Sequence, residues 1–110
     1  MSYSVEVATS FSRSAKRLAE KYPAKKKDRK GLVDTLEQTP LVGTPLGPWV
    51  HKVRLAISSK GKGKSGGARV ITFIQVQHEI VSLLAIYDKS ATESVTDKQI
   101  AELIRRVKDR

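Results

Sequence analysis

The residues best suited to chemistry in this sequence are the cations of one segment that contains no carboxylate. Between Glu37 and Glu79 there is no aspartate or glutamate. The same segment holds these cations: Lys52, Arg54, Lys60, Lys62, Lys64 and Arg69. Charge kept only for solubility would be scattered along the chain, so this concentration indicates a surface that binds a polyanion. The net charge of +10, from 21 lysines and arginines against 11 acidic residues, points the same way.

Three of these cations lie on predicted strands, which place charged groups more rigidly than a loop does. Apolar residues alternate with Lys52 and Arg54 over residues 50–57, which predicts a half-buried strand with both cations on its open face. Arg69 lies at the start of the next predicted strand. If the two strands pair as a hairpin, the three cations converge, and an arginine beside a scissile phosphate can stabilise transition-state charge. The alternative is a set of exposed strand cations without a catalytic role.

The loop predicted over residues 58–67 consists largely of glycine, serine and lysine. Gly63-Lys64-Ser65 resembles part of a phosphate-binding loop, but that motif needs a glycine where Ser58 stands and a helix afterwards. We therefore reject nucleotide binding. Two interpretations remain, a hairpin tip made basic for solubility and a cationic arm that grips an RNA backbone. The gripping residues would be Lys60, Lys62 and Lys64.

The end of the last predicted strand offers two further site residues. Tyr87 can stack on a base, although an aromatic side chain at the edge of the core is an equal interpretation. Lys89 can donate a proton to a leaving oxygen. His78 lies at a predicted surface turn, and strand alternation turns His51 away from Lys52, so neither histidine is favoured as a general base. The absence of cysteine excludes thiol chemistry, and two histidines alone predict no metal site.

The elements that position these residues follow the order β-α-α-β-β-β-α. Ser10 is a candidate N-cap for the first helix, and Thr96 with Gln99 forms a capping box for the last. Residues 41–48, rich in proline and glycine, are predicted as a loop. The predicted strands cover residues 3–8, 50–57, 68–77 and 79–87, and the first two helices cover residues 11–22 and 25–39.

This order predicts an α+β fold, with a small, mostly antiparallel sheet and helices packed on one face. The length suits one domain over residues 1–110. No apolar run approaches the roughly 20 residues that span a bilayer, and no secretion signal is evident, so a cytoplasmic protein is expected.

Taken together, these features resemble the RelE/ParE superfamily of bacterial toxins, and its HigB-like branch in particular. The specific stretches are residues 52–71, which include Lys60-Gly61-Lys62-Gly63-Lys64, and residues 83–89, which read Leu-Leu-Ala-Ile-Tyr-Asp-Lys. The resemblance implies the toxin of a type II toxin–antitoxin system, an mRNA interferase that cleaves mRNA on the ribosome and inhibits translation. In that family the ribose 2′-hydroxyl attacks the adjacent phosphate, with no metal or other cofactor.

Carried over by position, Lys52 and Arg54 match the family's basic pair on the second strand, which binds RNA and helps to activate the 2′-hydroxyl. Arg69 matches the arginine that stabilises the transition-state phosphate, and Lys89 falls near the basic residue at the leaving group. Many relatives also carry an aromatic residue or histidine near the C-terminus. Here no aromatic residue follows Tyr87, so either Tyr87 takes that role or the chain cleaves slowly, and the general base is unassigned.

The resemblance also implies partners, namely a cognate antitoxin, in an oligomer with the toxin, together with the ribosome and mRNA. Two other functions fit the same residues. One is a ParE-like toxin that acts on gyrase, and the other is an RNA-binding module that does not cleave its ligand.

The basic segment makes one prediction that needs no structure. If about six cations neutralise phosphates of single-stranded RNA, the logarithm of the binding constant falls with the logarithm of salt concentration at a slope of about −4. Fluorescence anisotropy of a labelled RNA over a series of salt concentrations measures that slope. A slope near zero would remove the basic segment from the binding site.

Overall fold

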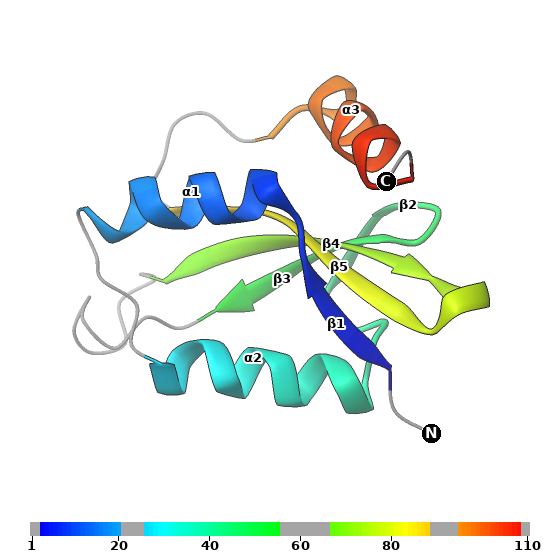
Figure 1. Cartoon of the computed structure of the whole chain (residues 1–110), viewed down its shortest axis with the longest axis horizontal. Helices are drawn as coiled ribbons and strands as arrows, with labels where there is room; N and C mark the ends of the chain where they lie inside the picture. Colours follow the sequence, from blue (N-terminus) through cyan, green and yellow to red (C-terminus); the bar gives the residue numbers. More distant parts are fainter. Residues whose placement is uncertain (1–2, 21–25, 56–66, 89–94, 109–110) are drawn as a thin grey trace.

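A computed structural model describes residues 3–20, 26–55, 67–88 and 95–108 of the chain (Figure 1). Five strands form one sheet in the order β1-β5-β4-β3-β2, in which β1 runs parallel to β5 and all other neighbours are antiparallel. The predicted α+β class and mostly antiparallel sheet are therefore confirmed. The elements are β1 (Ser4–Val7), α1 (Thr9–Ala19), α2 (Lys26–Gln38), β2 (Thr44–Gly47), β3 (Val50–Leu55), β4 (Ala68–Gln75), the 3₁₀ turn η2 (Val76–His78), β5 (Ile80–Asp88) and α3 (Asp97–Lys108).

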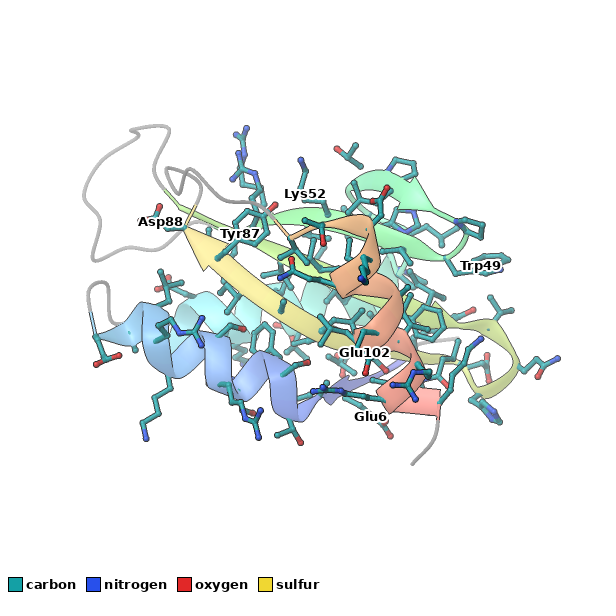
Figure 2. The ribbon with its side chains drawn as sticks, turned by 90° about the horizontal axis from the view of Figure 1, so that it is seen from above. Glu6, Trp49, Lys52, Tyr87, Asp88 and Glu102 are labelled. Atoms are coloured by element: carbon teal, nitrogen blue, oxygen red, sulfur yellow. The ribbon has the colours of Figure 1, made fainter. Side chains whose placement is uncertain are left out.

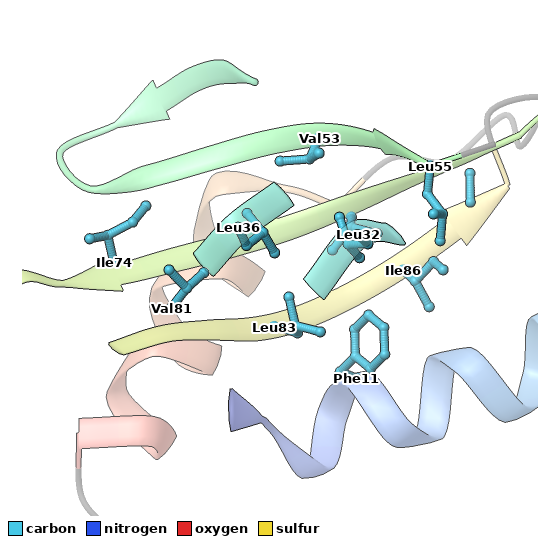
Figure 3. Close-up of a cluster of buried hydrophobic side chains, with 11 residues drawn as sticks. Phe11, Leu32, Leu36, Val53, Leu55, Ile74, Val81, Leu83 and Ile86 are labelled. Atoms are coloured by element: carbon cyan, nitrogen blue, oxygen red, sulfur yellow. The ribbon is translucent and has the colours of Figure 1, made fainter. Parts of the chain in front are cut away.

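The helices cover both faces of the sheet, so the prediction that they pack on one face is wrong. Leu32 and Leu36 of α2 pack on one face, which we call the α2 face and which carries Val53, Leu55 and Val70 (Figure 3). Ile100 and Val107 of α3 pack on the opposite face, the α3 face, which carries Val50, Ile71 and Phe73. Strands β4 and β5 are apolar on both sides, and a layer of helix on each side is what removes that surface from water.

Strand β2 lies within the segment predicted as a loop. Thr44 and Pro45 pair with Lys52 and His51, so β2 and β3 form a hairpin that turns at Pro48-Trp49. Proline and glycine suggest a loop, but an edge strand needs hydrogen bonds on one side only and tolerates both residues. A second loop was predicted over residues 58–67. Its residues up to 66 lie outside the described part of the chain.

Helix α1 closes the edge of β5 beyond the end of β1. Ser10 is not the N-cap, a position that Ala8 takes without any side-chain hydrogen bond. Instead the Ser10 hydroxyl donates to the carbonyl of Leu84 at 2.6 Å. One helical turn later, the Ser14 hydroxyl accepts a hydrogen bond from the backbone N–H of Ile86 at 3.1 Å. Two serines thus satisfy backbone groups that would otherwise need a neighbouring strand.

The β4–β5 ladder contains one extra residue on β5. Ile71 pairs with Ala85 whereas Thr72 pairs with Leu83, which leaves Leu84 without a partner on β4. This is the pattern of a β-bulge, which reverses the face on which each later side chain of the bulged strand lies. Leu84 is fully buried in the cluster beneath α3, and the Ser10 hydrogen bond holds its carbonyl.

The start of α3 agrees with its predicted capping box. The backbone N–H of Gln99 donates to the Thr96 hydroxyl at 3.1 Å, and the backbone N–H of Thr96 donates to the Gln99 side chain at 2.9 Å. The helix therefore begins where local sequence chemistry places it. Within the described ranges, no helix combines the length and apolar character needed to cross a bilayer.

The α1 serines generate a stability prediction. Ser14→Ala should lower the free energy of unfolding by about 1–2 kcal/mol, because the Ile86 N–H loses its acceptor in a partly buried position. Ser12, exposed on the same helix, provides the matched control, and Ser12→Ala should cause no loss. Urea denaturation of the three proteins tests this, and equal stability of Ser14→Ala and wild type would contradict it.

Candidate nucleic-acid interface

Two arginines and a tyrosine form one row across three neighbouring strands on the α3 face. Arg54 of β3 pairs with Arg69 of β4, and Arg69 pairs with Tyr87 of β5. Directly opposite residues have Cβ atoms about 4.5–5.5 Å apart, so the row is a compact unit. The row depends on the bulge, because an unbroken register would place Ile86 opposite Arg69.

Lys52 lies on the same face of the sheet, two residues before Arg54 on β3. It pairs with Ile71 and is two residues from Arg54, so strand alternation brings both cations to the α3 face. Figure 2 looks onto this face and shows Tyr87 near the end of β5, Trp49 toward the opposite end of the sheet, and Lys52 between them. The structure therefore brings together four of the residues that sequence reasoning selected, namely Lys52, Arg54, Arg69 and Tyr87.

The electrostatics of the row favour an anion. Arg54 and Arg69 stand directly opposite each other, an arrangement of like charges that destabilises a sheet. Within the described residues no carboxylate forms an ion pair with either of them, and the Arg69 guanidinium donates only to the carbonyl of Ala68, at 3.2 Å. A bound phosphate would relieve the repulsion and use the donors of both side chains.

Tyr87 is suited to contact a nucleotide as a neutral ring. Its side chain is partly buried and packs against the apolar cluster beneath α3. Burial raises the pKa of Tyr87 above its usual value, while the nearby positive charge of Arg69 acts in the opposite direction. The phenol therefore stays protonated at neutral pH, and Tyr87 can stack or donate a hydrogen bond but supplies no phenolate base.

The remaining predicted residues divide into two groups. His51 is buried in β3 on the side away from Lys52, as alternation predicts, with its Nδ1 atom unpaired, and His78 is exposed in η2. Within the described ranges, no group of three histidine, cysteine, aspartate or glutamate side chains is placed to hold a metal ion. Four predicted residues lie outside the described part of the chain: Lys60, Lys62, Lys64 and Lys89.

Sequence reasoning missed a groove between α1 and α3 that opens beside Tyr87. It encloses about 710 Å³ over Ala85 and Ile86 of β5. Arg13 and Arg17, four residues apart on α1, line one wall, and that spacing was the available signal because it places both on one helix face. The opposite wall comes from α3 and includes Lys98 and Arg106, which only the tertiary structure brings near α1.

The Tyr87–Arg69 pairing can be tested by titration. Arg69→Ala removes the positive charge that favours the phenolate, so the pKa of Tyr87 should rise further. Ultraviolet absorbance of tyrosinate measures this after subtraction of the signal of Tyr87→Phe, and Lys30→Ala on α2 is the control.

The same shift has a consequence for stability. The folded state holds the Tyr87 proton more tightly than the unfolded state does. The protonated phenol therefore makes its full contribution to the free energy of unfolding below the usual tyrosine pKa. That contribution is lost as pH rises through the higher, folded-state pKa. Tyr87→Phe should therefore lose less stability than wild type in that alkaline window.

In the titration described above, a Tyr87 pKa that falls in Arg69→Ala would contradict the pairing of Tyr87 with Arg69.

Known proteins share this architecture at low sequence identity. No protein-family model matches the sequence, and no curated protein matches it significantly. A mutant form of the Escherichia coli toxin RelE in the free state aligns with a TM-score of 0.57 and 14% identity, over 97% of this chain and 99% of that chain. The isolated Escherichia coli RelE toxin aligns with a TM-score of 0.55 and 15% identity, over 96% and 98%.

A third structure, the RelBE2 toxin–antitoxin complex of Mycobacterium tuberculosis, shares 19% identity over 78% of this chain and 96% of that chain. Its TM-score of 0.46 is too low to support a shared fold by itself. The two Escherichia coli structures span nearly all of both chains, and on their evidence this protein has the RelE toxin fold.

Proposed function

We propose that this protein is a cytoplasmic endoribonuclease toxin that inhibits translation by cleaving mRNA on the ribosome. The observation that carries the proposal is the row of Arg54, Arg69 and Tyr87 on the open end of the α3 face. The RelE toxin fold supports it at the level of architecture. We place the chain in the HigB-like branch on the stretches quoted above, over one domain of residues 1–110.

The proposed reaction is an attack of the ribose 2′-oxygen on the adjacent phosphorus, in which the proton of the 2′-hydroxyl passes to solvent water because no side chain is assigned as the general base. A new bond forms between phosphorus and the 2′-oxygen, and the bond from phosphorus to the 5′-oxygen of the next nucleotide breaks. One product then ends in a 2′,3′-cyclic phosphate and the other begins with a 5′-hydroxyl. Negative charge grows on the phosphate oxygens in the transition state, and the guanidiniums of Arg54 and Arg69 would stabilise it.

The other site residues would position the RNA. Lys52 would contact the strand near the attacking ribose, and Tyr87 would stack on a base because its ring is neutral and held at the edge of the apolar cluster. Lys89 would protonate the leaving 5′-oxygen, and Lys60, Lys62 and Lys64 would hold backbone phosphates.

Single substitutions in the row test the proposal. Arg69→Ala should reduce the cleavage rate by about 100-fold or more, because it removes a group aimed at charge that develops in the transition state. Its folding stability should not fall, since the change also removes a like-charge repulsion. The assay measures new 5′ ends on mRNA bound to translating ribosomes, with Lys30→Ala on α2 as the matched control.

Several results would contradict cleavage by this mechanism. A 2′-deoxy substitution at the cleaved nucleotide should abolish the reaction, and full cleavage of that substrate would exclude 2′-oxygen attack. DNA damage without new RNA ends would favour a ParE-like action on gyrase. RNA binding that Lys52→Ala and Arg69→Ala weaken, without any cleavage, would favour a non-catalytic RNA-binding module.

We also propose a protein antitoxin as partner, forming an oligomer with the toxin. An unliganded cluster of cations repels itself, and an acidic segment would relieve that repulsion. Expression should stop bacterial growth, and co-expression of a neighbouring reading frame should restore it. Growth that is unaffected without that frame would count against the toxin function.

A further inference from the structure

The groove between α1 and α3 carries a surplus of positive charge that the proposed reaction does not use. Arg13, Arg17, Lys98 and Arg106 line it together with one carboxylate, that of Glu102. Glu102 is engaged on its own helix, where its carboxylate contacts Arg105 at 2.6 Å and Arg106 at 3.4 Å. No carboxylate within the described ranges forms an ion pair with Arg13, Arg17 or Lys98. Among the described residues, three cations without an ion pair therefore face this groove of about 710 Å³.

The floor of the groove has a different character from its walls. Ala85, Ile86 and Tyr87 of β5 form the floor, and Val95 and Leu103 extend the apolar surface toward α3. An apolar floor between cationic walls matches a ligand with flat apolar groups joined by anionic ones. Single-stranded nucleic acid has this chemistry, because its bases stack on apolar or aromatic surfaces while its phosphates meet arginine and lysine.

Tyr87 connects the groove to the reactive row. It is the residue of β5 opposite Arg69, and it also lines the groove. A strand whose phosphate lies at Arg54 and Arg69 would therefore need only to continue past Tyr87 to enter the groove. Figure 2 shows the course of β5 between α1 and the α3 side of the molecule, with Tyr87 at the end of the strand.

We propose that the α1–α3 groove is an RNA-binding subsite that holds the nucleotides next to the cleaved one. Arg13 and Arg17 contact backbone phosphates from one wall, and Lys98 contacts them from the other. This inference rests on the proposed function for the position of the cleaved nucleotide, but it makes its own claim about which residues bind RNA.

The groove is less suited to a protein segment. A peptide cannot add to the sheet here, because Ser10 and Ser14 already bond the exposed backbone of β5 at Leu84 and Ile86. A nucleotide chain needs no free strand edge.

The test compares two non-cleavable RNAs, a trinucleotide and an octanucleotide with 2′-O-methyl groups, at low salt. Only the octanucleotide is long enough to fill both the row and the groove. Arg13→Ala/Arg17→Ala should weaken octanucleotide binding by about tenfold and make its salt slope shallower by about 1.4, the value for two lost phosphate contacts. Trinucleotide binding should not change.

The control is Lys16→Ala/Lys30→Ala, which removes the same charge from exposed positions outside the groove. An equal loss in both double variants would reduce the effect to overall charge and overturn the proposal. So would wild-type protein that binds the octanucleotide no better than the trinucleotide. RNA binding that is unchanged, together with lost inhibition by an acidic protein partner, would assign the groove to that protein instead.

The two proposals fail separately. If the wild-type protein cleaves no mRNA while the groove variant still loses octanucleotide binding, the proposed reaction fails and the groove stands as an RNA-binding site. If cleavage depends on Arg69 while the groove variant binds and cleaves like wild type, only the subsite fails.

Discussion

The single extra residue at Leu84 is the constraint on which the arrangement of this molecule depends. Before the bulge, Val81 and Leu83 lie on the α2 face, and after it Tyr87 lies on the α3 face opposite Arg69. An unbroken ladder would exchange Tyr87 for Ile86, because side chains alternate between faces with a period of two. Leu84 also lies just beyond the end of β1, where the edge of β5 is uncovered, and the Ser10 hydroxyl donates to its carbonyl. The same serine therefore ties α1 to the strand that carries the tyrosine.

This constraint gives the two faces of the sheet different roles. The α2 face is covered by Leu32, Leu36 and Phe11, and no strand cation lies on it among the described residues. The α3 face is covered over only part of its length, so cations can stand at its open end without being desolvated by a helix. Apolar burial on both sides of β4 and β5 stabilises the sheet. That stabilisation outweighs the repulsion between the two opposed arginines. A phosphate bound between the two arginines, as proposed, would relieve their repulsion.

The groove between α1 and α3 adds further cations beside the row of Arg54, Arg69 and Tyr87. Arg13 and Arg17 reach the end of the sheet that carries Tyr87 only because α1 lies along β5, where the α1 serines complete the hydrogen bonding of that strand. The contacts that protect the sheet edge thus also place two arginines beside Tyr87. The packing of α1 and the proposed RNA-binding subsite therefore depend on the same contacts.

The sequence by itself determined the α+β class, most of the strands and helices and the capping box at Thr96, since each depends on local periodicity or local capping chemistry. It also selected Lys52, Arg54, Arg69 and Tyr87 as candidate site residues, and that selection stays a prediction. Only the tertiary structure decided that β2 pairs as an edge strand, that α3 packs opposite α2, and that Ser10 bonds β5 instead of capping its helix. The tertiary structure also decided where the bulge in β5 lies. Apolar residues run almost without a break over residues 80–86, so no alternation marks the position of the extra residue. The face of Tyr87 follows from pairing with distant strands, which local sequence does not encode.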